Sequence, residues 1–272
     1  GLDGWPAHQP SPLHHRRDRA LIHRPLTRLI GIALAIYLAP GLGAVAAEGF
    51  EPPPDFKARY EVRKAGITLG RADLRFAQPV PGRYRYSLHT RASGLARLLF
   101  SSEVYEQSHG RILDNGFRPD FYRYQRSGDD KAREAELRFD WLDLEVVNDV
   151  ADYPWRMDIT HDTIDRVIGP LQLMHDLAER DGDDDQLVYR IADGGQLKTY
   201  LLTIEGTEMI DTPMGTFEAI RIRRRDTDSN RETRLWCAPE LDYLAVRVEQ
   251  HEDGDQNFRL SLAALDGLDS SR

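Results

Sequence analysis

The sequence predicts a mainly β protein in which a single antiparallel sheet curls into a half-barrel or barrel-like shape, accompanied by one short helix. Two observations carry this prediction. Apolar and charged residues alternate along much of the chain, and turns rich in Gly, Asn and Asp separate the alternating stretches. A sheet with one apolar and one charged face must close or curl around its apolar side, as a barrel, a half-barrel or a sandwich.

The first two strands are expected to form a hairpin. Residues 56–63 alternate apolar and charged side chains, and residues 71–76 do so again after Gly66 and Gly70, which favour a turn or a bulge. The same alternation returns in five later stretches, residues 84–88, 135–141, 200–204, 244–248 and 258–262. These stretches indicate an antiparallel meander.

One segment has helical rather than strand spacing. Between Pro170 and Arg180, apolar residues recur at Leu171, Met174 and Leu177, with Pro170 suited to a first helical turn. We expect a single helix there, covering an open end or face of the sheet.

The N-terminal 47 residues have the order of a secretory signal peptide. A polar and basic region is followed by an uncharged apolar run and then by small residues. Signal peptidase requires small side chains near the cleaved bond, and Ala44, Ala46 and Ala47 fit cleavage before Ala47 or Glu48. Residues 48–272 are then expected to form a single β-rich periplasmic domain with no integral membrane span. The alternative is an uncleaved anchor, because the apolar run is nearly long enough to span a bilayer.

The charge of the chain argues against nucleic acid as a partner. The formal net charge is −9, and removing a leader of net charge +3 leaves −12, which repels phosphate backbones. A local exception is a group of six arginines, Arg221, Arg223, Arg224, Arg225, Arg231 and Arg234. They could meet an anionic sugar or lipid headgroup, but the acidic residues among them favour ion pairs across neighbouring strands.

Candidates for catalysis are few. The single cysteine, Cys237, lies in a predicted strand and is expected to be buried and inert. His161-Asp162 and His175-Asp176 could serve a hydrolase, but no Gly-x-Ser-x-Gly or His-Glu-x-x-His motif accompanies them. The acidic run Asp181–Asp185 lacks the ligand spacing of a calcium loop. The sequence therefore predicts no metal site, no cofactor and no catalytic residue.

Three sequence pieces carry a family resemblance. They are Gly116-Phe117-Arg118-Pro119, the stretch from Asp211 to Ala219 with its Thr-Pro-x-Gly-x-Phe core, and Leu235-Trp236 with Val246. From about Phe56 to Leu265 the chain resembles the exported bacterial family known as Domain of Unknown Function 3108. This resemblance implies a periplasmic antiparallel half-barrel of uncertain function. Gly215 is expected to make a turn, Phe217 to start the next buried strand, and Trp236 to be structural.

These features favour a non-enzymatic envelope protein that binds an apolar or amphipathic ligand, such as a lipid or a lipid-linked glycan, in the concavity of the sheet. The groove would be lined by the aromatic residues Tyr60, Tyr84, Tyr86, Phe121, Tyr122, Tyr124, Phe139, Trp141 and Trp155. A structural or interaction module that contacts another envelope protein is one alternative. A hydrolase that uses His161 or His175 is another.

The leader gives a direct test. When the chain is expressed in a bacterial host with its leader, we expect the periplasmic fraction to contain a protein that begins at Ala47 or Glu48. Intact-mass spectrometry and N-terminal sequencing would measure this. An uncleaved chain in the membrane fraction would instead support the anchor.

Overall fold

A computed structural model describes residues 50–94, 96, 103–128, 133–150, 154–181, 184–226 and 231–268. By internal contacts the chain divides into two units, Gly1–Val45 and Ala46–Arg272. The predicted leader and its cleavage residues Ala44, Ala46 and Ala47 lie outside the described residues. The sheet and helix described below belong to the second unit.

The described residues form one large sheet with one α-helix and a short 3-10 helix. The strands are β1 (Phe56–Lys64), β2 (Ile67–Ala77), β3 (Arg83–Ala92), β4 (Glu103–Leu113), β5 (Gly116–Ser127), β6 (Arg133–Asp140), β7 (Glu145–Asn148), β8 (Trp155–Asp158), β9 (Thr163–Asp165), β10 (Gln186–Asp193), β11 (Gln196–Thr212), β12 (Gly215–Asp226), β13 (Arg231–Ala238), β14 (Leu244–Glu252) and β15 (Asp255–Asp266). The helices are α1 (Gly169–Ala178) and η2 (Pro239–Leu241).

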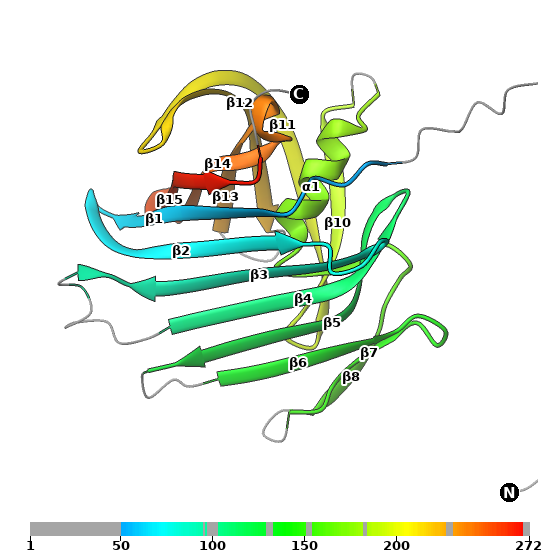
Figure 1. The fold of residues 1–272 in the computed structure, drawn as a ribbon. Helices are drawn as coiled ribbons and strands as arrows, with labels where there is room; N and C mark the ends of the chain where they lie inside the picture. The colour runs from blue at the N-terminus through cyan, green and yellow to red at the C-terminus, as the bar shows by residue number, and fades with distance from the viewer. Residues whose placement is uncertain are drawn as a thin grey trace, which may run out of the picture. The chain divides into compact units, whose positions relative to one another are not determined.

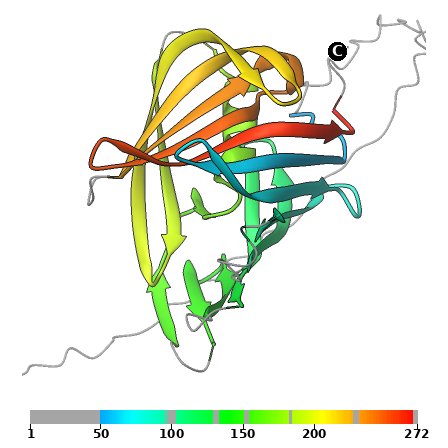
Figure 2. The same cartoon turned by 90° about the vertical axis from the view of Figure 1, so that its left-hand side faces the viewer.

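The strand order shows how the sheet is assembled. The order is β8-β7-β6-β5-β4-β3-β2-β1-β15-β14-β13-β12-β11-β10-β9, so the first and last strands pair in the middle of the sheet. Strands β1–β8 form one arm and β9–β15 the other, and the two arms curve toward each other (Figures 1 and 2). The outer strands β8 and β9 do not pair, so the predicted curled sheet is confirmed as one that does not close into a barrel.

The predicted alternation sets the core. In β1, Phe56, Ala58 and Tyr60 are buried while Lys57 and Arg59 between them are exposed. The first hairpin has its turn at Ala65-Gly66 and a register shift opposite Gly70, as the glycine spacing indicated. One pairing departs from the expected antiparallel meander, because β9 runs parallel to β10 after the chain has crossed from one arm to the other.

The helix is confirmed, and it lies on the inner face of the curled sheet. Helix α1 contacts β5 of one arm and β14 of the other, and lies within the curve of the sheet (Figure 2). Leu171, Leu173, Met174 and Leu177 are buried, and so are the polar residues Gln172 and His175. The helix therefore fills the interior that an open half-barrel would leave as a groove.

Side chains of the helix connect the two arms where the backbone does not. On one side, Gln172 accepts a hydrogen bond from the Phe117 amide at 2.9 Å and donates one to the Asn115 carbonyl at 3.2 Å. On the other side, the Tyr189 hydroxyl of β10 donates to Asp176 at 2.6 Å. The arms also approach at the rim, where the Trp155 ring lies 3.4 Å from the position that a Cβ on Gly195 would take.

The long hairpin β11–β12 folds over a neighbouring part of the sheet. Strand β12 pairs with β13 only from Ile220 onward, and the hairpin tip reaches β15, where the Met214 amide donates to the Leu262 carbonyl at 3.2 Å. Gly215 begins β12 with a positive φ of 155°. Phe217 and Trp236 are buried, and the Trp236 indole donates to Glu208 of the hairpin at 2.8 Å.

The interior position of the helix predicts a large effect on stability. Leu171 is 0% exposed, so Leu171→Ala should lower the free energy of unfolding by about 2–5 kcal/mol through lost burial and a residual cavity. Leu142 is 96% exposed, and Leu142→Ala is the matched control with little expected change. Urea denaturation followed by circular dichroism measures both. Similar midpoints for the two variants would contradict a packed interior helix.

Candidate ligand-binding cavity

The largest concave polar site lies between the two arms, beside the start of the helix. It is a cavity of about 510 Å³ whose walls come from β3 and β4 on one side and from β10–β15 on the other. Arg166, Val167 and Pro170, which lead into α1, also line it. Volumes of this size are typical of small-molecule sites.

The register of the strands explains why this part of the interior is polar. Ile222, Leu235 and Val248 form an apolar row across β12, β13 and β14. A second row on the same face lies two residues further along each strand and consists of Arg224, Thr233 and Gln250. All three line the cavity. The apolar core thus ends at a defined level, and the cavity begins there.

Arg224 lies against both aromatic and polar groups. Its guanidinium carbon is 4.6 Å from the centroid of the Tyr200 ring, and its Nη2 donates to the Thr233 hydroxyl at 2.9 Å. Around it, Lys198 pairs with Asp193 at 2.7 Å and Arg231 with Glu252 at 3.0 Å. The wall therefore presents cations and carboxylates side by side, next to an aromatic ring.

Glu106 and Arg166 form the opposite wall. The Arg166 side chain donates twice to Glu106, at 3.0 and 2.8 Å, and the Tyr122 hydroxyl donates to the same oxygen at 2.6 Å. Burial alone would lower the pKa of Arg166, but the charge of Glu106 outweighs it and raises that pKa. Arg166 remains charged, and it joins the segment before the helix to β4.

A second, smaller cavity adjoins the first. It has a volume of about 140 Å³, and Arg166 and Asp193 line both cavities. Tyr122, Tyr124 and Trp155 line the smaller one, which reaches toward the unpaired edge of the sheet. Together the two cavities form a polar groove with aromatic rings along it.

A buried carboxyl group lies behind this wall. Asp165 is fully buried and accepts hydrogen bonds from the amides of Val167 and Ile168, and from Ser108 at 2.5 Å. Burial raises the pKa of Asp165 to about 7, against the effect of these hydrogen bonds. Tyr84 shares a hydrogen bond of 3.0 Å with Ser108, which extends the network into the core.

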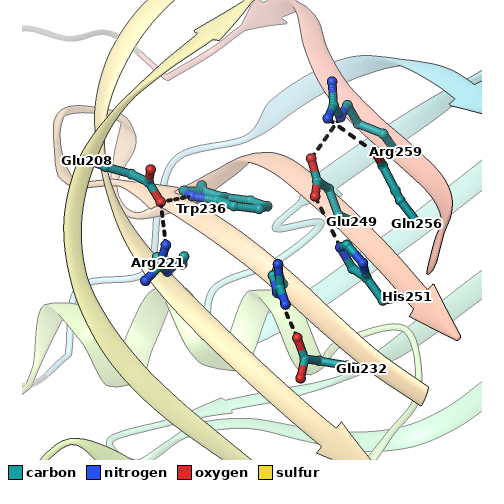
Figure 3. Close-up of polar contacts among 9 residues, drawn as sticks. Glu208, Arg221, Glu232, Trp236, Glu249, His251, Gln256 and Arg259 are labelled. Atoms are coloured by element: carbon teal, nitrogen blue, oxygen red, sulfur yellow. Dashed lines mark hydrogen bonds and ion pairs between the residues drawn. The ribbon is translucent and has the colours of Figure 1, made fainter. Parts of the chain in front are cut away.

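The predicted arginine group divides into two faces of the sheet. Arg223 pairs with Glu205 at 2.6 Å, Arg221 contacts Glu208 at 3.2 Å, and Arg234 pairs with Glu232 at 2.7 Å. Figure 3 shows such contacts, together with those of Glu249 to His251 and Arg259. Arg221 and Arg223 form the expected ion pairs across strands and Arg234 pairs within β13, whereas Arg224 and Arg231 line the cavity on the other face.

The structure brings the two predicted His-Asp pairs together, because His161, Asp162 and Asp176 line one cavity and His175 contacts Asp176. The buried His175 contacts Asp176 at 2.7 Å through Nδ1 and the Asp114 carbonyl at 3.2 Å through Nε2, so both ring nitrogens are engaged. Burial opposes a charged imidazole, but these contacts outweigh it and raise the pKa of His175. His161 and Asp176 line a separate cavity of about 170 Å³. Among the described residues on its wall, the hydroxyl groups are those of Thr163, which bonds Thr160, and Tyr189, which bonds Asp176.

Other reactive groups give no site in the part of the chain that the structure describes. Cys237 is buried, and burial raises the pKa of its thiol to about 12, which disfavours a thiolate. Among the described residues, no cluster of three or more His, Cys, Asp and Glu is placed to hold a metal ion. A helix able to cross a membrane is also not found within the described ranges.

The expected aromatic groove is replaced by packed core. Tyr60, Tyr84, Tyr86, Tyr122 and Phe139 are buried in the apolar cluster. Of this predicted set, Tyr122, Tyr124 and Trp155 line a cavity within the described part of the chain. Sequence reasoning named Arg224 only as one of six arginines and missed Thr233 and Gln250. Their two-residue spacing from Ile222, Leu235 and Val248 marks the same face.

Asp165 predicts a dependence of stability on pH. Between its ordinary pKa of 3.8 and about 7, the folded state keeps a proton that the unfolded state has lost. The free energy of unfolding should therefore fall as pH rises through this window, by on the order of 4 kcal/mol for this group. Asp165→Asn cannot ionise, so its stability relative to the unchanged protein should increase from pH 4 to pH 8. Urea unfolding at several pH values measures the difference, and parallel curves would contradict the prediction.

Comparison with known proteins places the chain in a family. Residues 56–262 match a family described as a protein of unknown function, DUF3108. No curated protein matches the chain by sequence.

One solved structure has a similar fold. The chain is similar to a beta-barrel-like protein of domain of unknown function DUF1849 from Brucella abortus, at 13% identity and a TM-score of 0.53, over 80% of this chain and 99% of that one. A candidate exported protein with a YmcC-like fold from Bacteroides fragilis has 12% identity and a TM-score of 0.30, over 80% and 98%. A candidate lipoprotein from Parabacteroides distasonis has 12% identity and a TM-score of 0.33, over 80% and 99%. The family match covers most of the chain, which therefore belongs to the DUF3108 family.

Proposed function

We propose that the protein is a non-enzymatic binding protein of the cell envelope, which holds the carbohydrate part of a glycan or glycolipid in the cavity between its two arms. The observation that carries this proposal is the composition of the cavity wall. Cations, carboxylates and neutral polar groups alternate around a volume of about 510 Å³.

This wall suits sugar hydroxyl groups, each of which can donate and accept hydrogen bonds. Glu106, Asp193 and Glu252 supply acceptors, while Lys198, Arg224 and Gln250 supply donors. Tyr200 and, in the adjoining cavity, Tyr124 and Trp155 offer aromatic rings beside these groups. These aromatic rings can contact the apolar faces of a sugar ring, while the neighbouring polar groups form hydrogen bonds with the hydroxyl groups at its edges.

An acyl chain fits the same interior poorly. Helix α1 and the aromatic core occupy the apolar part of the concavity, and the remaining space has charged walls. Burying an alkyl chain against charged groups would remove their water without replacing its hydrogen bonds. If the ligand is lipid-linked, its glycan part is the part that we place in the cavity.

The envelope location rests on the leader. Its order of basic, apolar and small residues is that of an export signal. In this proposal the leader delivers residues 48–272 to the periplasm, where they form a single domain and meet glycans and glycolipids.

Two consecutive arginines provide a matched test. Arg224 faces the cavity, whereas Arg223 is on the other face of β12 and pairs with Glu205. We expect Arg224→Gln to weaken glycan binding by about tenfold or more, the usual size of a lost charged hydrogen bond. Arg223→Gln should bind like the unchanged protein.

The measurement is an array of bacterial glycans, followed by calorimetry on those that bind and on dodecanoate as an acyl probe. Thermal unfolding of both variants checks that they are folded. Binding to one or more glycans that is selectively lost in Arg224→Gln supports the proposal. Binding to dodecanoate without any glycan, binding to neither, or equal loss in both variants would contradict it.

A further inference from the structure

A second depression lies on the opposite, solvent-facing side of the sheet, over β15, β1, β2 and β3. Its volume is about 480 Å³, and it is open to solvent. Ser87 and Ala264, which have short side chains, line it between longer residues of neighbouring strands. The depression is therefore a gap in a layer of long charged side chains.

The charge of this depression is opposite to that of the molecule as a whole. Four cations line it, Lys57, Arg59, Arg75 and Arg91, against two carboxylates, Asp73 and Asp266. These six side chains leave an excess of two positive charges, in a chain whose formal net charge is −9. A local excess of this kind attracts anions despite the acidic total.

One carboxylate is shared among three arginines. Asp73 lies 2.8 Å from Arg59, 2.8 Å from Arg91 and 3.4 Å from Arg71. Although partial burial acts to raise the pKa of Asp73, the hydrogen bonds from Arg59 and Arg91 prevail and lower it. Among the described residues, the buried Nε of Arg91 has no hydrogen-bond partner. The cluster therefore has more donors than its own carboxylate can satisfy.

Two further cations lie side by side without a shared anion. Lys57 and Arg75 are direct partners across β1 and β2, and like charges in this position are destabilising. No ion pair is recorded for either within the described ranges, although Asp266 is the partner of Lys57 in β15. A bound anion between Lys57 and Arg75 would relieve this repulsion.

We propose that this depression binds a phosphate group. A phosphate monoester carries close to two negative charges at neutral pH and has three terminal oxygens, which can accept from several guanidinium and ammonium groups at once. A carboxylate ligand has only two oxygens, and the side chain of Asp73 already supplies one carboxylate to the cluster. The site is separate from the cavity between the arms, so it adds a second ligand to the proposed function.

The test uses glucose 1-phosphate, with glucose as the uncharged control. Calorimetry at low ionic strength gives the affinity, and shifts of backbone amide signals in NMR spectra locate the contact. We expect binding of glucose 1-phosphate and not of glucose, with amide shifts at β1, β2 and β3 and weaker binding as salt is added. Lys57→Gln combined with Arg75→Gln should lower the affinity at least about tenfold.

Two controls separate this site from other effects. Arg63 lies on β1 but does not line the depression, so Arg63→Gln should leave the affinity unchanged. Arg224→Gln, in the other cavity, should also leave it unchanged, so failure here is distinct from failure of the glycan proposal. Equal binding of glucose, no binding of glucose 1-phosphate or of vesicles, or an equal loss in Arg63→Gln would overturn the proposal.

A vesicle arm identifies the source of the phosphate. Vesicles of phosphatidylcholine with and without phosphatidic acid are sedimented with the protein and with the Lys57→Gln, Arg75→Gln double variant. Binding that requires phosphatidic acid and both cations assigns the phosphate to a lipid headgroup. Binding of glucose 1-phosphate without vesicle binding assigns it to a free sugar phosphate.

Discussion

The structure depends on side-chain hydrogen bonds that join the outer parts of the two arms, where no backbone pairing connects them. The sheet is open, because β8 and β9 at its two ends do not pair. The arms pair through β1 and β15 at the centre of the sheet, and their outer parts are joined through the interior segment, by Gln172 to β5 and by Asp176 to Tyr189 of β10. Ser108 and Glu106 of β4 bind Asp165 and Arg166 at the start of that segment. These bonds are buried or partly buried, where leaving one unmade is costly, so they fix the curvature and with it the shape of the cavity.

The fold class could be predicted from the sequence because its signals are local. Alternation with a period of two and turn residues between the strands depend on neighbouring residues alone. The helix was also evident, but its position was not, since spacing does not distinguish a helix that covers a sheet from one enclosed by it. The pairing of β1 with β15 joins residues some 200 positions apart, and no local pattern specifies that contact.

The sites were harder to predict, for two different reasons. The arginines from Arg221 to Arg234 are conspicuous because they are close in sequence, yet most of them are paired with glutamates of adjacent strands. Lys57 and Arg75 lie on different strands, as do Arg71 and Arg91, and each pair becomes adjacent only through register. The polar row of Arg224, Thr233 and Gln250 likewise depends on the pairing of β12, β13 and β14. The register of the strands decides which charges cluster in a sheet, and a single sequence does not reveal that register.

The division of the cavity wall between the two arms has a thermodynamic consequence. Glu106 belongs to one arm, Arg224 and Gln250 to the other, so a molecule that touches all three adds a bridge between them. Occupancy would then be linked to the folding equilibrium of the whole sheet, with a stabilisation that grows with the logarithm of the free ligand concentration above its dissociation constant. In such a molecule the loaded and empty forms differ in resistance to unfolding, even when the path of the backbone is unchanged.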